Sequence, residues 1–93
     1  MVIGLLQVEV HYPGAQSLKE KRFVLQSLLD RVRRKFNVTA AEVEYQNKWQ
    51  KSVLAVVHVN TSRAGADGVL SAVMNLMESE AEMQVTGVQT EFL

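Results

Sequence analysis

The sequence predicts an α+β fold in which four strands and two helices follow one another in the order βαββαβ. Apolar residues recur at every second position in four stretches, which is typical of strands. Two stretches between them have apolar residues at helical spacing and begin with residues that favour a helix start. The chain has 93 residues and no repeat, long linker or low-complexity segment. Residues 1–93 are therefore predicted to form a single domain.

The first predicted strand covers residues 2–12. Every second residue of the run Val2–Val10 is apolar or glycine, whereas the opposite face becomes polar toward Glu9 and His11. This alternation predicts a strand with one buried face. The turn signal Pro13-Gly14 then ends it.

The segment from Ser17 to Phe36 predicts an amphipathic helix. Ser17 and Glu20 have the spacing of a capping box, in which each side chain accepts a hydrogen bond from an otherwise unpaired backbone N–H group. Asn37 is expected to adopt the left-handed conformation that closes many helices. Lys21 falls within the apolar arc, where its stem could pack while its ammonium group reaches water. The arc consists of Leu18, Val24, Leu25, Leu28, Leu29, Val32 and Phe36.

Residues 38–45 and 53–59 are predicted to pair as a hairpin. The first of these strands is expected to place Glu42 and Glu44 on one face and its apolar residues, Ala41, Val43 and Tyr45, on the other. The second is β-branched and apolar on both faces, which is typical of a central strand. A polar loop of residues 46–51 joins them and contains the only tryptophan of the chain.

A second amphipathic helix is expected between residues 60 and 80. Asn60, Thr61 and Ser62 are its candidate N-caps. Its apolar stripe consists of Val69, Leu70, Val73, Leu76 and Met77. The last predicted strand covers residues 83–93, and Gly87 is expected to shift its alternation as a β-bulge would.

These elements predict the split β-α-β, or ferredoxin-like, arrangement, in which a four-stranded antiparallel sheet carries both helices on one face. The other face is then left open. Ile3, Leu5, Leu54 and Val56 are expected on it. Uncovered apolar area of this kind suits a homodimer that forms through the open sheet face.

His11 and His58 are expected to lie near each other on the open face, because their strands are expected to be parallel neighbours. With Glu9 and Glu44 they are the only group that resembles a metal or acid–base site. No tight ligand spacing supports such a site. Walker loops, nucleophile elbows and paired cysteines are also absent from the sequence. We therefore predict no metal, no cofactor and no catalytic residue.

Charge is unevenly distributed along the chain, although ten Lys and Arg residues balance ten Asp and Glu residues. Nine of the cations lie in residues 1–51, and only Arg63 lies in residues 52–93. The sequence has no cysteine, no signal-peptide pattern and no apolar run long enough to span a membrane. We expect a cytoplasmic protein that does not associate with membranes.

The predicted binding surface combines the basic first helix with the hairpin loop. Phe23 lies opposite the apolar arc, and an aromatic ring among cations suits stacking on a base or docking on a partner protein. Trp49 either caps the open end of the core or serves as a stacking platform. The alternative for the helix is an ordinary solvated face. The candidate binding residues are Lys19, Lys21, Arg22, Phe23, Arg33, Arg34, Lys35, Gln46, Lys48, Trp49 and Gln50.

Five segments of the chain together are similar to a known family. They are the opening run Val2–His11, then Ser17–Arg22, Phe36–Val38, Ala41–Val43 and the loop Gln46–Gln50. In this combination the chain resembles the YlxP-like family of small bacterial proteins over essentially its whole length. The resemblance implies a ferredoxin-like fold, an unknown function, and genes often placed beside those of translation-initiation and ribosome-maturation factors. It also leads us to expect a further basic residue after Arg22, where this chain has Phe23.

Three functions are compatible with these features. The first, which we expect, is a non-enzymatic protein that binds RNA or a ribosomal subunit through the basic helix and the tryptophan loop. The second is an acylphosphatase-like hydrolase that would use Pro13–Gln16 and Arg22, although the glycine-rich, arginine-containing loop of that family is missing. The third is a regulatory module that dimerises through its sheet. An acidic protein would attract the same cations, so the class of partner stays open.

Overall fold

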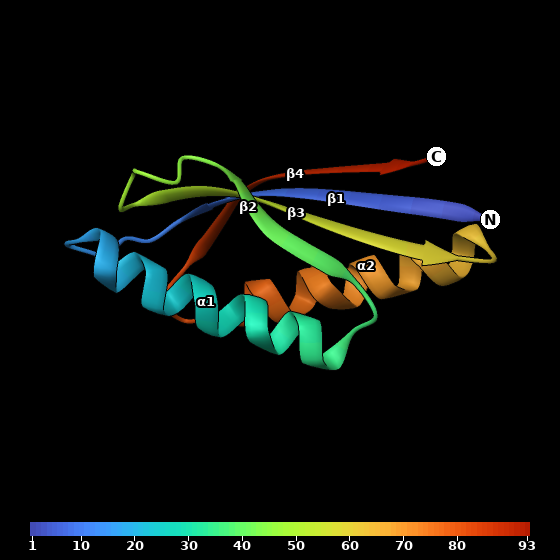
Figure 1. The fold of residues 1–93 in the computed structure, drawn as a ribbon, viewed down its shortest axis with the longest axis horizontal. Coiled ribbons are helices and arrows are strands. Elements are labelled where there is room, and N and C mark those ends of the chain that lie inside the picture. The colour runs from blue at the N-terminus through green and yellow to red at the C-terminus, as the bar shows by residue number, and fades with distance from the viewer.

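The computed structural model describes residues 1–93 and confirms the predicted order of elements. They are β1 (Val2–His11), α1 (Leu18–Lys35), β2 (Thr39–Glu44), β3 (Lys51–Asn60), α2 (Arg63–Glu78) and β4 (Gln84–Phe92). The strands form one sheet in the order β2-β3-β1-β4, and every neighbouring pair is antiparallel. Both helices cover one face of the sheet and the other face is open (Figure 1). None of the helices is long and apolar enough to cross a membrane.

The core lies between the sheet and the two helices. Alternate residues of the central strands β1 and β3 point toward the helices and are fully buried, because strand side chains alternate between faces. The buried set includes Leu6, Val8 and Val10 of β1, Leu54 and Val56 of β3, Leu25, Leu28, Leu29 and Val32 of α1, and Leu70, Val73 and Met77 of α2. The helix stripes predicted from periodicity are thus confirmed.

The composition of the open face differs from the prediction. Leu6 pairs with Val56 and Val8 pairs with Leu54, so both β3 residues face the helices and are buried. Val57 and Val59 occupy the open face instead, opposite Leu5 and Ile3. Because β3 is apolar on both sides, its sequence alone could not indicate which set faces inward. The homodimer prediction therefore keeps Ile3 and Leu5 but loses its other two residues to the core.

The predicted proximity of the two histidines is wrong. Since β1 and β3 are antiparallel, His11 pairs with Lys51 at one end of the sheet and His58 pairs with Gly4 at the other. His58 is buried on the helix side, where its Nδ1 atom lies 2.8 Å from the Asn37 carbonyl oxygen. No group of three or more potential metal ligands forms anywhere in the chain.

The ends of the helices follow their capping residues. Ser17 accepts a hydrogen bond from the Glu20 N–H group at 3.1 Å, and Glu20 reaches back to the N–H group of Gln16, so the predicted capping box is confirmed with a shift of one residue. At the other end, the helix closes through an extended Phe36, and Asn37 is not left-handed as predicted.

Two β-bulges adjust the sheet. In β2, Glu42 pairs with Leu54 and Glu44 pairs with the adjacent Val53, so one extra residue, Val43, is inserted. Glu42 consequently faces the helices while Glu44 faces the open side, and the prediction that they share a face is wrong. In β4 the register shifts beside Gly87, as predicted.

Candidate functional site

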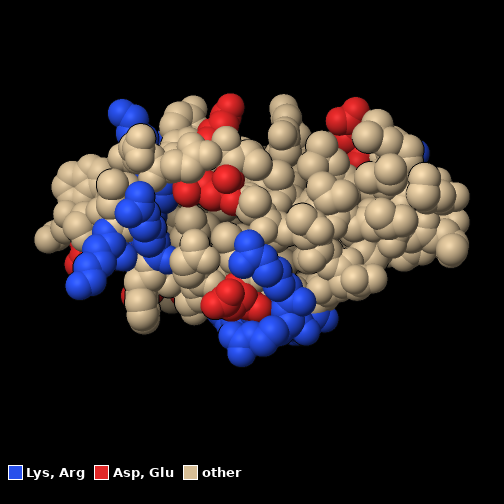
Figure 2. All heavy atoms as spheres, in the orientation of Figure 1, with Lys and Arg blue, Asp and Glu red and all other residues tan.

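The eleven candidate residues fall into three places rather than on one continuous surface. Lys19, Arg22 and Phe23 are exposed on the first turns of α1, and Arg33, Arg34 and Lys35 are exposed in its last turn. The remaining exposed candidates, Gln46, Lys48, Trp49 and Gln50, lie on the β2–β3 loop. Arg22 and Arg33 are separated by roughly 16 Å along the helix axis, at about 1.5 Å per residue. Figure 2 correspondingly shows the blue side chains of this face in two main groups.

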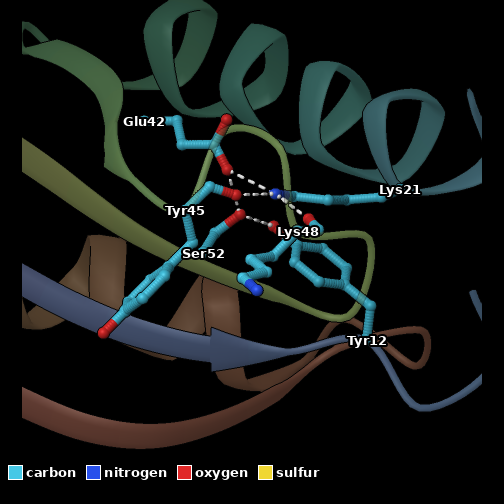
Figure 3. A network of polar contacts seen from close by, with 6 residues as sticks. All are labelled: Tyr12, Lys21, Glu42, Tyr45, Lys48 and Ser52. Carbon is cyan, nitrogen blue, oxygen red and sulfur yellow. Dashed lines mark hydrogen bonds and ion pairs between the residues drawn. The ribbon is translucent and has the colours of Figure 1, made fainter. Parts of the chain in front are cut away.

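Lys21 is the one candidate that cannot contact a partner, because the residue is 0% exposed. Its Nζ atom donates to the backbone oxygens of Tyr45 at 2.7 Å and Lys48 at 2.5 Å. It also lies 2.8 Å from a carboxylate oxygen of Glu42. Figure 3 shows this side chain extending from α1 between helix and sheet toward these three acceptors. The prediction that Lys21 binds a partner, and the alternative of a lysine that reaches water, are both wrong.

A chain of buried hydrogen bonds continues from Glu42 into the sheet. Ser52 of β3 donates to the same carboxylate oxygen that Lys21 contacts, and the Tyr12 hydroxyl donates to Ser52 at 3.0 Å. Burial raises the pKa of Tyr12 from 10.0 to about 12, although the hydrogen bond to Ser52 opposes this rise. The Lys21 ammonium group therefore has three acceptors, the two loop carbonyls and a Glu42 carboxylate that Ser52 also contacts. A buried charge requires such partners.

The β2–β3 loop is tied to the body of the domain at both ends. At its start Tyr45 has a φ angle of 66°, and its carbonyl group accepts both Lys21 and the N–H group of Lys48. At its end Gln50 donates from its side chain to the Ala15 carbonyl at 3.2 Å, and the Gln50 carbonyl accepts the N–H group of Tyr12 at 3.0 Å. The loop is therefore fastened to α1, to the β1–α1 turn and to β1.

Trp49 projects from this fastened loop and is 45% exposed. The alternative in which it caps the core is not observed, because Trp49 is neither in the core cluster nor among the apolar residues packed against it. On the first turns of α1, to which Lys21 ties the loop, Phe23 is 76% exposed, which confirms its predicted place opposite the apolar arc. Lys19, Arg22 and Lys48, all exposed, make no ion pair.

A shallow groove of about 1020 Å³ runs beside Phe23. One wall is the outer side of α1, and the others are the β1–α1 turn and the connection between α2 and β4. Its rim carries both signs of charge, with Lys19, Arg22 and Arg34 near Glu20, Asp30 and Glu82. The groove extends the exposed surface around Phe23 but contains no convergent set of polar groups.

The cations in the last turn of α1 are mostly engaged within the domain. Arg33 donates to the Ala40 carbonyl at 2.6 Å and lies 3.8 Å from Asp30. Arg34 donates to the Asp30 carbonyl at 3.3 Å, and Lys35 lies 5.7 Å from the centre of the Phe36 ring. These residues support the end of the helix, and no aromatic residue there is as exposed as Trp49 or Phe23.

On the open face, Lys51 and Glu9 form an ion pair at 3.0 Å on neighbouring strands. The hydrogen bond to Glu9 raises the pKa of Lys51, whose Nζ atom also lies 4.5 Å from the centre of the Tyr45 ring. This pair occupies the same end of the sheet as the loop. It makes that end of the open face polar, in contrast to the apolar end near Ile3 and Val59.

The buried network was not predicted from the sequence, because its members lie far apart in the chain. Lys21 inside an apolar arc was the one visible signal, since a buried lysine needs acceptors. The identity of those acceptors depends on the β2 bulge, which turns Glu42 toward the helices. Nothing in the local sequence pattern indicates Tyr12 or Ser52 as partners.

Fold and surface together define a small ferredoxin-like α+β protein with a basic first helix and a tryptophan-bearing hairpin loop. The family described as "Protein of unknown function (DUF503)" matches residues 3–90. The chain is also 37% identical over 91 residues to the uncharacterized protein YlxP of Bacillus subtilis (strain 168), covering 98% of this chain and 99% of that protein. The chain belongs to this family of YlxP-like proteins, as its sequence segments predicted.

Solved structures support the fold alone. The de novo designed protein Foldit4 is similar with a TM-score of 0.60 at 13% identity, over 96% of each chain. A second de novo designed protein, with a ferredoxin fold, is similar with a TM-score of 0.57 at 15% identity, over 98% of this chain and 88% of that one. These similarities confirm the ferredoxin-like arrangement.

Proposed function

We propose that this protein is a non-enzymatic RNA-binding protein whose contact surface is formed by the first turns of α1 and the β2–β3 loop. The α1–loop surface consists of Lys19, Arg22, Phe23, Lys48 and Trp49. The observation that carries the proposal is a half-exposed tryptophan on a loop that Lys21 fastens to the first turns of α1. Lys19 and Arg22 on these turns and Lys48 on the loop are exposed and form no ion pair.

Aromatic and cationic side chains contribute in different ways to such a surface. An exposed aromatic ring can stack on an unpaired base, because every base has a π-face. Lysine and arginine side chains attract phosphates and release counterions, which makes affinity depend on salt. Trp49 and Phe23 project outward, so we expect unpaired bases of a loop or single strand to be bound rather than a continuous duplex.

The β1–α1 turn favours a binding role over the hydrolase alternative. A loop that cradles phosphate needs free backbone N–H groups. Pro13 has none, Ala15 donates to the Tyr12 carbonyl, and Gln16 donates to Glu20. Gly14 is then the only residue of this turn whose N–H group is left for a phosphate, which supports a protein without this hydrolase activity.

The test is equilibrium binding of the purified protein to an RNA hairpin with an unpaired loop, to a fully paired duplex and to ribosomal subunits. Ribosomal subunits are included because the family resemblance implies genes placed beside those of ribosome-maturation factors. For the hairpin we expect affinity that falls as salt rises. Trp49→Ala should weaken binding about tenfold, since stacking contributes ~1–3 kcal/mol per base.

Two double variants, each of which removes two cations from α1, provide a matched comparison. Lys19→Ala with Arg22→Ala should reduce the slope of log affinity against log salt by about 1.5, as two lost phosphate contacts would. Arg34→Ala with Lys35→Ala should change the slope less, because these residues lie roughly 18 Å or more along the helix from Arg22. Equal effects of the two double variants, or no RNA binding at low salt, would contradict the proposal.

A further inference from the structure

We infer that Lys21 is the positioning residue of the α1–loop surface: its buried ammonium group sets the conformation of the β2–β3 loop and thereby the orientation of Trp49. The effect on binding rests on the proposed function, whereas the effect on the loop does not. Lys21 itself is 0% exposed and cannot reach a ligand. Any influence on binding must therefore pass through the groups that it contacts.

The contacts of Lys21 are placed where they restrain the loop. Its Nζ atom holds two loop carbonyls, those of Tyr45 and Lys48, which are three residues apart. The same two residues are joined by the N–H group of Lys48, which donates to Tyr45 at 3.0 Å. One ammonium group thus closes a turn that leads directly into Trp49. Figure 3 shows that backbone atoms make these contacts, while the Tyr45 ring points away from Lys21.

The loop has few other means of keeping this conformation. All residues from Val43 to Gln50 are exposed, and Gln50, which donates to the Ala15 carbonyl, is the one loop residue whose side chain forms a hydrogen bond to the rest of the domain. Tyr45 also adopts a left-handed φ of 66°, which is unfavourable for a residue with a side chain. A buried charge with good acceptors can offset that cost, because separating it from them would leave it unpaired.

Glu42 and Ser52 make the position of the ammonium group specific. The carboxylate lies 2.8 Å from Nζ and also accepts the Ser52 hydroxyl, which in turn accepts Tyr12. These partners come from β2, β3 and the end of β1, so Lys21 is aligned by the sheet while it holds the loop. The network therefore fixes the position of the exposed β2–β3 loop relative to the sheet.

A double variant tests this inference without leaving a charge unpaired. Lys21→Met with Glu42→Gln removes both charges and keeps an acceptor for Ser52. Lys19→Met is the matched control, since it makes the same change on the exposed side of the same turn. Trp49 is the only tryptophan, so its fluorescence reports on the loop directly. Acrylamide quenching and emission anisotropy are measured on the free protein, with circular dichroism to verify folding.

We expect greater quenching and lower anisotropy of Trp49 in the double variant, and no change in Lys19→Met. Affinity for the RNA hairpin should fall about tenfold in the double variant, because a mobile loop must be ordered on binding. Its salt slope should stay at the wild-type value, because no phosphate contact has been removed. Lys19→Met should instead reduce the slope. This difference in slope distinguishes a residue that positions the loop from a residue that contacts a phosphate.

Each result has a defined meaning. Unchanged Trp49 fluorescence in a folded double variant would overturn the inference, and so would a salt slope that falls as in Lys19→Met. If wild-type protein binds no RNA but the double variant still frees Trp49, the proposed function fails while the positioning role stands. Should the double variant not fold, Lys21→Ala is assayed with added propylammonium, which should restore the wild-type Trp49 signal. Failure of propylammonium to do so would also overturn the inference, and so would equal restoration by the quaternary tetramethylammonium, which has no N–H group to donate.

Discussion

The two ends of α1 carry similar cations in very different surroundings. At the first turns, Lys21 is buried and donates to loop carbonyls. Lys19 and Arg22 are exposed near Phe23 and form no ion pair. In the last turn, Arg33 and Arg34 are both engaged with groups of the domain itself. The number of cations is therefore a poor guide to a binding surface, and the local acceptors decide what each cation does.

The two ends of α1 also differ in how the neighbouring aromatic residues are held. The surface that we propose needs rings that are exposed yet held in place, and the buried Lys21 network holds the loop that carries Trp49. The last turn has no comparable network, and Arg33 and Arg34 support helix and strand through one or two contacts each. Four predictions test this contrast.

The largest expected effect is on stability, at the buried end. Lys21→Met leaves the Glu42 carboxylate buried without its partner and should lower the free energy of unfolding by about 3–5 kcal/mol. Lys19→Met, at an exposed position in the same turn, should change it by less than about 0.5 kcal/mol. Urea denaturation measures both. If Lys21→Met and Lys19→Met were equally stable, the Lys21–Glu42 contact would not be formed in solution.

Tyr12 provides a test at alkaline pH. Its pKa is raised from 10.0 to about 12, so the unfolded chain loses this proton at a lower pH than the folded chain does. The free energy of unfolding should be unaffected below pH 10 and fall by about 2–3 kcal/mol as pH rises from about 10 to about 12.

Tyr12→Phe should show a smaller loss of stability over this range than the wild type does. Thermal or urea unfolding at several alkaline pH values measures the difference. An identical alkaline profile for wild type and Tyr12→Phe would show that the phenol of Tyr12 is not buried in the network.

A smaller effect is expected in the last turn of α1. Arg33→Ala removes the hydrogen bond to the Ala40 carbonyl and should cost about 1 kcal/mol of stability. Lys35→Ala should cost less than about 0.5 kcal/mol, because this exposed side chain makes no ion pair. A cost for Arg33→Ala as large as that for Lys21→Met would remove the distinction between the two ends.

The smallest effect on folding is expected at Phe23, which is 76% exposed. Phe23→Ala should change the free energy of unfolding by less than about 0.5 kcal/mol. Its affinity for the RNA hairpin should nevertheless fall by ~1 kcal/mol if a base stacks on the ring. Loss of stability without loss of affinity would assign Phe23 to packing instead. Denaturation and binding assays on the same sample separate the two.

Much of the fold could be predicted from periodicity and capping. The helix beginning after Ser17 and the strand with Leu6 and Val8 on its buried face depend on residues that are near one another in sequence. The side of β3 that faces the helices could not be assigned, because apolar residues on both sides of a strand do not indicate which side is buried. The histidine pairing failed for a related reason, since strand direction is a property of the whole sheet.

Of the candidate site, sequence identified the exposed members and misplaced one. Phe23 was correctly placed by its angle on the helix, and the loop with Trp49 was correctly placed between two strands. Lys21 was grouped with the binding cations because its charge alone suggested a surface. Its three acceptors lie 21, 24 and 27 residues further along the chain, outside the range of any local pattern.

The sequence by itself determined the order of the elements, the amphipathic helices and the presence of a basic segment, because these depend on neighbours within a turn or two. Only the tertiary structure decided which cations are free. Burial and hydrogen bonding set the cost of every charge, and the groups that meet Lys21 come together only when α1 packs on the sheet beside the bulge in β2.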